Sequence, residues 1–371
     1  MKNKRKLFLS LMSLVLTTLI ITSCRKEKTF IPEEQEQLPP QAVSEIKGFY
    51  LLNEGNMGSN KASLDYYDFS TGVYRRNIYN QINPEVTLGM GDVGNDIQIY
   101  GARMYVVINM SDKVEVLNAT TSKRIGQINI PNCRYITFDK GKAFITAYDG
   151  YVSVVDTASL REEKRITVGK QPEEMAVFGT KLYVANSGGY NYPNYERTVS
   201  VIDLNSLTET KRIDVAINLH HIKADQYGDL YVTSRGDYYD IPSKLFVIDT
   251  KTESVKKTFN IAASDIVISK DKAYIYSVEY NYNTGGNTVG YSLLNVKDET
   301  LIAGSFITDG TDKEIKIPYG IAVNPLNEDV YVTDAGDYVS PGTLYCFDKN
   351  GKKKFSVGTG DIPAHIAFLY K

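Results

Sequence analysis

The side chains with the most chemical potential stand in pairs, each pair directly before the apolar core of a recurring β-strand. The seven pairs are Asn95-Asp96, Arg134-Tyr135, Glu173-Glu174, His220-His221, Ser264-Asp265, Tyr319-Gly320 and Ala364-His365. All three histidines of the chain fall among them. Imidazole beside carboxylate suits two kinds of chemistry, the binding of a divalent metal ion and general acid–base catalysis.

Neither kind of chemistry has a supporting motif around these pairs. Glu174, His221 and Asp265 could together ligate a metal, and His221 or His365 with Glu174 is the one candidate acid–base set. The sequence contains no CxxC, no glycine-rich phosphate loop after a strand and no GxSxG. Polar residues are also expected wherever strands begin at a wet channel mouth. We therefore predict no catalytic residues, no metal site and no resident cofactor.

Five long loops form a second group of candidates, because they combine tyrosine with glycine and asparagine. They begin at Asn53, Asn186, Ser234, Val278 and Asp334. Tyrosine offers large, stiff, amphipathic contact area, while glycine and asparagine adapt to polar partners, a composition typical of binding loops. The alternative is that these loops only cover strand ends in a chain that is rich in tyrosine throughout (28 residues).

We expect the strand starts and the long loops to form one binding surface. Its candidate residues are Asn53, Asp96, Arg134, Tyr135, Glu174, Asn186, Tyr192, His221, Arg235, Tyr238, Tyr280, Asp337, Tyr338 and His365. In this interpretation the loop tyrosines pack against apolar edges of a ligand. Arg134, Asn186, Arg235 and Asp337 bond to its polar groups.

Repeated strands must position these residues. One strand recurs as GFYLLN, RMYVVI, KAFITA, KLYVAN, DLYVTS, KAYIYS and DVYVTD, starting at residues 48, 103, 142, 181, 229, 272 and 329. Each copy is followed by an apolar run that closes on Asp or Asn, at positions 68, 118, 156, 203, 249, 295 and 348. A period of roughly 40–50 residues is typical of four-stranded propeller blades. We therefore predict an all-β, seven-bladed β-propeller with four antiparallel strands per blade.

The two ends of this domain predict how the ring closes. The first copy, in residues 47–53, lacks the innermost strand that precedes every other copy, and the C-terminus carries a spare strand in residues 362–369. We expect the spare strand to complete the first blade, which removes an exposed sheet edge. The propeller is predicted to span residues 46–371.

The N-terminus reads as an export signal. Residues 1–23 have a basic start and a short apolar stretch, and Ile21-Thr22-Ser23-Cys24 resembles a bacterial lipoprotein cleavage box. We predict acylation of Cys24 and a flexible tether in residues 24–45, which is acidic and proline-containing. An ordinary signal peptide or membrane anchor that happens to contain a cysteine is the alternative.

Charge and cysteine content bear on two further points, nucleic-acid binding and disulfide formation. The formal net charge is −2 and no basic stripe runs along the chain, which argues against nucleic acid as a partner. Cys133 and Cys346 are the only cysteines besides Cys24, and they lie in distant repeats. Two separate buried thiols are favoured over a disulfide between them.

The repeats KLYVAN and DLYVTS, with partner strands that end on aspartate, resemble YVTN/YncE-like propellers over residues 46–371. A lipoprotein cleavage box followed by a Tyr- and Asn-rich propeller is similar to Bacteroidetes surface lipoproteins that capture cobalamin (the BtuG type). The resemblance implies an outer-membrane, outward-facing lipoprotein, not an enzyme, that passes a corrinoid to a TonB-dependent transporter. His221 or His365 would then be candidate axial ligands of the cobalt. A surface propeller for a glycan, peptide or protein stays open, as does a propeller lactonase or lyase.

Overall fold

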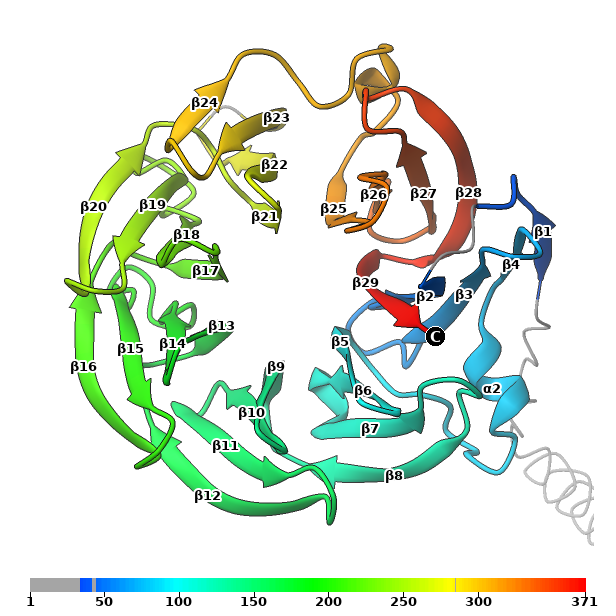
Figure 1. The fold of residues 1–371 in the computed structure, drawn as a ribbon, viewed down its shortest axis with the longest axis horizontal. Coiled ribbons are helices and arrows are strands. Elements are labelled where there is room, and N and C mark those ends of the chain that lie inside the picture. Colours follow the sequence, from blue (N-terminus) through cyan, green and yellow to red (C-terminus); the bar gives the residue numbers. More distant parts are fainter. Residues whose placement is uncertain (1–33, 42–44, 284) are drawn as a thin grey trace, which may run out of the picture. The chain divides into compact units, whose positions relative to one another are not determined.

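Antiparallel strands make up nearly all the regular structure in this computed structural model, which describes residues 34–41, 45–283 and 285–371. They form seven separate sheets, arranged as blades around a central axis (Figure 1). Six sheets have four strands and one has five. The predicted all-β, seven-bladed β-propeller is confirmed.

Each blade is a meander that runs from the central axis outward (Figure 1). The innermost strands are β29 (Pro363–Tyr370), β5 (Gly94–Tyr100), β9 (Cys133–Asp139), β13 (Pro172–Phe178), β17 (Leu219–Ala224), β21 (Asp265–Ser269) and β25 (Pro318–Val323). The second strands are β2 (Ile46–Asn53), β6 (Arg103–Ile108), β10 (Lys142–Ala147), β14 (Lys181–Asn186), β18 (Asp229–Ser234), β22 (Lys272–Asn281) and β26 (Val330–Asp334). These second strands coincide with the seven repeats that the sequence analysis identified.

The outer half of each blade completes the meander. The third strands are β3 (Ser63–Asp68), β7 (Lys113–Asn118), β11 (Tyr151–Asp156), β15 (Thr198–Asp203), β19 (Lys244–Asp249), β23 (Gly286–Asn295) and β27 (Pro341–Phe347). The outer strands are β4 (Val73–Arg75), β8 (Arg124–Asn129), β12 (Arg161–Thr167), β16 (Thr208–Asp214), β20 (Ser254–Phe259), β24 (Thr300–Ile302) and β28 (Lys353–Asp361). Within the described ranges, three short helices lie in connections between strands: α2 (Ile78–Ile82), η1 (Asn109–Ser111) and η2 (Thr311–Lys313).

The hydrophobic core lies between neighbouring blades, because both faces of the inner strands are buried. Strand β14 illustrates this: Leu182 and Val184 pack in a cluster with β10 and β11, whereas Tyr183 and Ala185 pack in a cluster with β17 and β18. Side chains alternate between the two faces of a strand, so a strand buried on both faces needs apolar residues at successive positions. The near-continuous apolar runs of the repeats follow from this packing.

The aspartates and asparagines that end the third strands close tight turns. Asp156 accepts hydrogen bonds at Oδ1 from the backbone N–H and the hydroxyl of Ser159, at 2.7 Å each. Asp203 accepts at Oδ1 from the backbone N–H groups of Asn205 and Ser206. Short acceptor side chains stabilise such turns by replacing a backbone partner. The recurrent Asp or Asn is therefore structural.

The C-terminal strand closes the ring as predicted. β29 pairs with β2 in antiparallel register, from Ile46 opposite Tyr370 to Asn53 opposite Pro363 (Figure 1). The first blade thus takes its innermost strand from the end of the chain. Cys133 and Cys346 are both free and buried, in two different clusters of the core, which confirms the prediction of two separate thiols.

The fifth strand of the first blade comes from the segment assigned above to the tether. β1 (Gln35–Gln37) pairs with the outer strand β4, and Leu38 beyond it is buried against the blade. Gln41 is held by the ammonium of Lys354, at 2.5 Å. The proposed signal peptide, Cys24 and tether residues 25–33 and 42–44 lie outside the described residues. Within the described part of the chain, no helix is long and apolar enough to cross a bilayer.

Candidate functional site

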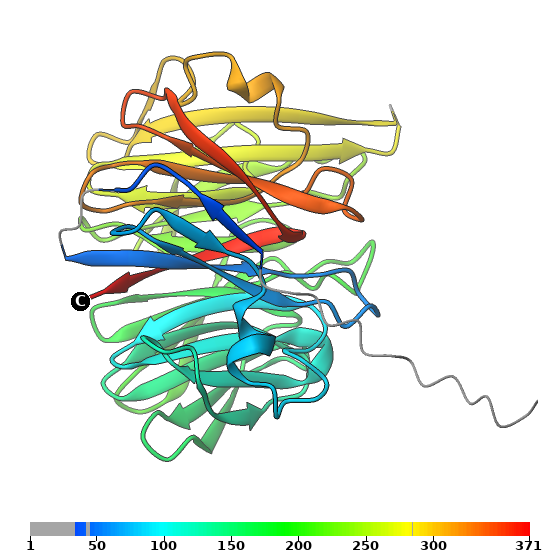
Figure 2. The ribbon, with the colours of Figure 1, turned by 90° about the vertical axis from the view of Figure 1, so that its right-hand side faces the viewer.

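Two cavities occupy the region around the propeller axis, one at each end. The mouth cavity, of about 750 Å³, lies where the innermost strands begin, and Arg134, His220, Arg235 and Tyr319 are among its lining residues. The base cavity, of about 410 Å³, lies toward the ends of those strands, beside Gln98, Lys270 and Phe368. His221, Asp265 and His365 line both cavities and form the waist between them. In Figure 2, which views the propeller from the side, the hairpin of β22 and β23 (yellow) extends past the neighbouring blades.

A β-bulge explains why polar residues come in pairs at the strand starts. In the blade of β17 and β18, Leu219 pairs with Ser234 and Ile222 with Val232, so His220 and His221 together face Thr233. The same kind of shift occurs at the starts of β5, β9, β13, β25 and β29. β21 is regular there. Bulges re-aim side chains next to functional sites, which places both members of a pair near the axis.

Threonines on the second strands satisfy backbone groups that two of these bulges release. The hydroxyl of Thr146 accepts the N–H of Tyr135 at 3.0 Å, and the hydroxyl of Thr233 accepts the N–H of His221 at 3.0 Å. An unpaired buried N–H would otherwise destabilise the fold by roughly 1–3 kcal/mol. The bulged geometry is therefore built into the second strand as well as the first.

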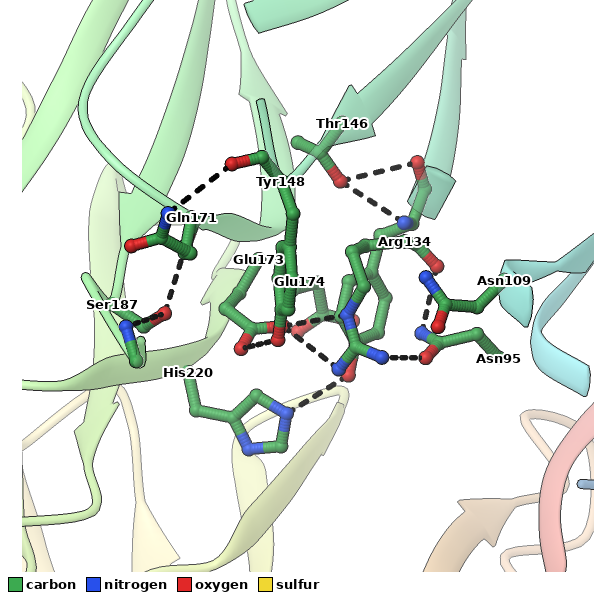
Figure 3. A network of polar contacts seen from close by, with 12 residues as sticks. Asn95, Asn109, Arg134, Thr146, Tyr148, Gln171, Glu173, Glu174, Ser187 and His220 are labelled. Atoms are coloured by element: carbon green, nitrogen blue, oxygen red, sulfur yellow. Dashed lines mark hydrogen bonds and ion pairs between the residues drawn. The ribbon is translucent and has the colours of Figure 1, made fainter. Parts of the chain in front are cut away.

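A buried carboxylate organises the wall of the mouth cavity (Figure 3). Glu173 has no exposed surface. Arg134 donates to its Oε2 from Nε at 3.2 Å and Nη2 at 3.1 Å, and Arg235 donates to its Oε1 from Nη1 at 3.0 Å. The Tyr148 hydroxyl also donates to Oε1, at 2.6 Å, and Asn95 accepts from Nη1 of Arg134. Burial opposes ionisation of Glu173, yet Arg134 and Arg235 keep its pKa below the usual range.

His220 stands beside this wall as an uncharged imidazole. Its Nε2 lies 2.9 Å from the hydroxyl of Tyr135. Burial, together with the positive charges of Arg235 and Arg134, lowers the pKa of His220 well below its ordinary value. A neutral imidazole can donate at one nitrogen and accept at the other. His220 therefore presents a polar, uncharged group to the mouth cavity.

The waist is a network of ionisable side chains in close contact. Nδ1 of His221 lies 3.2 Å from Oε2 of Glu174 and 3.6 Å from Oδ1 of Asp265. Lys223 forms an ion pair with Oε1 of Glu174. Burial would raise the pKa of Glu174, but Lys223 and His221 lower it to about 2. Glu174 is therefore an ionised structural partner at neutral pH.

His365, on the closing strand β29, carries the opposite electrostatic character to His220. Its Nε2 lies 3.7 Å from Oε1 of Glu54, whose Oε2 accepts the Tyr319 hydroxyl at 2.9 Å. Burial alone would lower the pKa of His365, but Glu54 and the negative charge of Asp96 raise it overall. The cavity lining thus contains one histidine that resists protonation and one that favours it.

Tyrosines form the rim of the mouth cavity in two groups. Tyr238, Tyr239, Tyr280 and Tyr338 line the cavity and are each about two-fifths exposed. Tyr192, Tyr195 and Tyr282 are absent from that lining. They join the rim through ring contacts: Tyr239 stacks on Tyr282 with centroids 5.1 Å apart, and Tyr192 lies 5.9 Å from Tyr239.

The structure brings eight of the predicted site residues together in the lining of the mouth cavity. They are Arg134, Tyr135, His221, Arg235, Tyr238, Tyr280, Tyr338 and His365. Asp96 and Glu174 line the base cavity instead.

The other four predicted residues lie away from both cavity linings. Asn53 and Asn186 are fully buried and donate to serine hydroxyls on the neighbouring strand. Asp337 caps its own loop by accepting the N–H groups of Val339 and Ser340. Tyr192 belongs to the outer tyrosine group. Asn53, Asn186 and Asp337 thus have structural roles in their blades and loop, and their predicted contact with a ligand stays a prediction.

Sequence reasoning missed the buried Glu173, the neutral His220, and the cavity-lining Glu54 and Tyr319. The signal for three of them was present, since Glu173, His220 and Tyr319 are the first members of three of the seven pairs. What the sequence does not state is the bulge that sets where each member of a pair lies. Among the described residues there is no group of three or more His, Cys, Asp or Glu side chains arranged to hold a metal ion.

Comparison with known proteins places the chain in a family and in a fold. The family model described as "Domain of unknown function (DUF5074)" matches residues 47–366. No curated protein matches the sequence.

Solved structures resemble this chain at low sequence identity. A quinonprotein alcohol dehydrogenase-like protein from Bacteroides thetaiotaomicron aligns with a TM-score of 0.64 and 17% identity, over 88% of this chain and 79% of that one. Hydrazine synthase from Kuenenia stuttgartiensis aligns with a TM-score of 0.59 and 17% identity, over 69% and 77%. The Pan2 WD40 domain of Neurospora crassa aligns with a TM-score of 0.53 and 11% identity, over 75% and 80%. At these identities the likeness supports the propeller fold alone.

Proposed function

This chain belongs to the DUF5074 family, and we propose that it binds a corrinoid such as cobalamin in the mouth cavity. In this proposal it is a lipoprotein of the outer membrane, anchored through Cys24, that passes the ligand to a TonB-dependent transporter. The sequence resemblance to cobalamin-capturing surface lipoproteins motivates the choice of ligand and partner. The geometry of the mouth cavity supplies the physical support.

One observation carries the proposal: a wide, open cavity has a rim of tyrosines and a floor of polar groups. Tyr238 and Tyr338 lie in loops and Tyr280 lies in the hairpin strand β22, so the three come from different blades, and the lining they share includes Arg134, Asn95 and His220. A corrinoid is a broad, flat ring with apolar edges and many projecting amides. Tyrosine rings suit the edges, and the floor groups suit the amides. A rigid ligand also loses little conformational freedom on binding, which keeps the entropic cost low.

The state of the acid–base groups favours binding over catalysis. Glu174, the candidate partner of His221, is held as an ionised carboxylate by Lys223, with its pKa lowered to about 2. A general base works best with a pKa near the operating pH. His365 is likewise engaged with Glu54. We therefore propose a binding protein without a catalytic step or a cofactor of its own.

The test is a titration of the purified protein with hydroxocobalamin or cyanocobalamin, followed by calorimetry and by co-elution of the red chromophore on gel filtration. We expect one corrinoid per chain with an affinity in the micromolar range or tighter. Absence of binding at micromolar corrinoid would contradict the proposal. Release of the protein from membranes by Cys24→Ala would test the proposed anchor separately.

A second candidate, glycan binding, is favoured by the outer tyrosines. Tyr192 and Tyr282 are about three-fifths exposed, and neither lines the mouth cavity. Exposed aromatic faces can pack against sugar rings, and a contiguous exposed patch often marks an interaction site. A glycan that binds the chain while cobalamin does not would favour this candidate over the corrinoid.

A further inference from the structure

The group formed by Arg134, Glu173 and Arg235 in the wall of the mouth cavity holds two positive side chains and one negative side chain. Arg134 and Arg235 both bind Glu173, which leaves one net positive charge in this buried group. His220, beside it, adds no charge because its pKa is lowered by burial and by Arg235. Side chains buried to this degree rarely keep an uncompensated charge without a partner.

The two arginines differ in how fully their donors are used. Arg134 donates from Nε and Nη2 to Glu173 and from Nη1 to Asn95. Its guanidinium carbon also lies 4.6 Å from the ring centre of Tyr148. Among the described residues, Arg235 donates from its guanidinium only through Nη1, to Glu173. A guanidinium has five N–H groups in a fixed fork. Arg235, a quarter exposed and lining the mouth cavity, therefore has donors left for a ligand.

The acidic residues that line the mouth cavity contact groups other than Arg235. Glu54 accepts from Tyr319 and lies beside His365, and Glu279 accepts the backbone N–H of Ser243. Asp265 faces His221 across the waist, and Asp240 is exposed at the rim. Glu54, Glu279 and Asp265 thus contact other groups and not Arg235. An anionic group on a ligand would therefore be the complementary partner for the remaining donors of Arg235.

We propose that Arg235, held in place by Glu173, forms an anion subsite that receives the phosphodiester of the bound corrinoid. Guanidinium groups bind phosphate oxygens through paired, charge-assisted hydrogen bonds. This assignment rests on the proposed function. It adds a specificity: the cavity distinguishes a complete cobalamin, which carries one phosphodiester, from cobinamide, which lacks the phosphate and nucleotide.

The experiment compares two ligands and four proteins in phosphate-free buffer by calorimetry. The proteins are the wild type, Arg235→Gln, Arg235→Lys and the control Arg165→Gln, whose arginine pairs with Glu162 on the outer strand β12. We expect Arg235→Gln to weaken cobalamin binding roughly 10- to 100-fold and cobinamide binding no more than about threefold. Arg235→Lys keeps the charge and should lie in between, and Arg165→Gln should match the wild type.

Several outcomes would overturn the assignment. Equal losses for cobalamin and cobinamide would mean that Arg235 acts on the cavity as a whole and not on the phosphate, while corrinoid binding itself would stand. A cobinamide affinity that rises with added inorganic phosphate, and that Arg235→Gln makes insensitive to phosphate, would assign the subsite to a free anion. Failure of the wild type to bind either corrinoid would remove the proposed function and this subsite together.

Discussion

At the scale of single residues, two histidines that line one cavity respond to pH in opposite directions. His365 has its pKa raised by Glu54 and Asp96 in spite of burial, and His220 has its pKa lowered by burial and by Arg235. Both unfolded-state values lie near 6.5. The folded state therefore favours the proton on His365 and rejects it on His220.

The sign of each effect on stability follows by linkage. The raised pKa of His365 stabilises the fold below about pH 6.5, and this contribution is lost as the pH rises through the folded-state value. We expect His365→Gln to be most destabilised, relative to the wild type, in acid, with the difference shrinking toward pH 9 or so. Thermal melts from about pH 5 to about pH 9 measure this.

His220→Gln is the matched comparison, with the opposite sign. The lowered pKa of His220 makes the wild type lose stability as the pH falls below about 6.5, because protonation favours the unfolded chain. The stability of His220→Gln relative to the wild type should therefore rise as the pH falls. Parallel pH profiles for the two variants would contradict the electrostatic assignment of both histidines.

Glu173 is the residue whose loss should destabilise the mouth most. Glu173→Gln leaves two arginines without their shared carboxylate, and breaking a buried ion pair typically costs about 3–5 kcal/mol. Glu162→Gln is the control, since the Glu162–Arg165 pair is partly exposed and should contribute at most about 1 kcal/mol. Urea unfolding of both variants gives the comparison, and similar costs would show that Glu173 does not organise the wall.

The sequence predicts where the polar pairs occur, but it does not predict where each member of a pair lies. That polar pairs precede the innermost strands was readable from the sequence, and eight of the predicted residues do line the mouth cavity. Where each member of a pair lies depends on a bulge of one residue, and the residue types of the pairs do not mark that bulge. Asn53 and Asn186 have a binding-loop composition around them, yet hydrogen bonds to buried serines hold them inside the blades.

At the scale of elements, β29 is the strand on which ring closure depends. Deleting residues 362–371 removes the partner of β2 and exposes the edges that the closure covers. The deletion removes the buried Ile362, Ala367 and Leu369 and the half-buried Ile366 and Phe368. At about 1.5–3 kcal/mol per large buried side chain, the lost hydrophobic stabilisation amounts to several kcal/mol. We expect the truncated chain to be insoluble or to melt well below the full-length domain, by at least ten degrees or so.

A chain that starts at Glu45 is the matched truncation at the other end. It loses β1, which pairs with β4 through three residues at the outer edge of the blade, and the buried Leu38. We expect a loss of about 1–3 kcal/mol and a melting temperature only a few degrees lower. Equal losses from the two truncations would contradict the view that closure depends on β29 and not on the edge strand.

The propeller was predictable because its repeats are long and strongly patterned, whereas β1 was not. Seven copies of a strand buried on both faces are visible as apolar runs, and the spare C-terminal strand follows from counting them. The stretch Gln35–Gln37 is polar and short, with no pattern that distinguishes it from a linker. It becomes a strand only because β4 offers it a free edge, which is tertiary context and absent from local sequence.

At the scale of the whole propeller, the two ends should differ in function. If the mouth binds the corrinoid, Tyr238→Ala and Tyr280→Ala should each weaken binding by about 1–4 kcal/mol, as expected for aromatic anchors. Lys140→Ala, on an exposed turn at the opposite end of the blades, should leave the affinity unchanged. Calorimetry with cobalamin decides the matter, and similar losses at both ends would contradict the choice of the mouth.

The pairing of β1 with β4 also limits how far the propeller can lie from a lipid anchor at Cys24. If Cys24 carries the lipid, the first strand residue held by the blade after it is Gln35 and not Ile46. The 11 peptide units between Cys24 and Gln35 span at most about 40 Å, against about 75 Å for a linker that ran to Ile46. Halving the radius reduces the volume that a tethered body can search roughly eightfold and raises its effective concentration near a membrane partner accordingly. Three residues of edge strand would thus keep the propeller close to any transporter that shares its membrane.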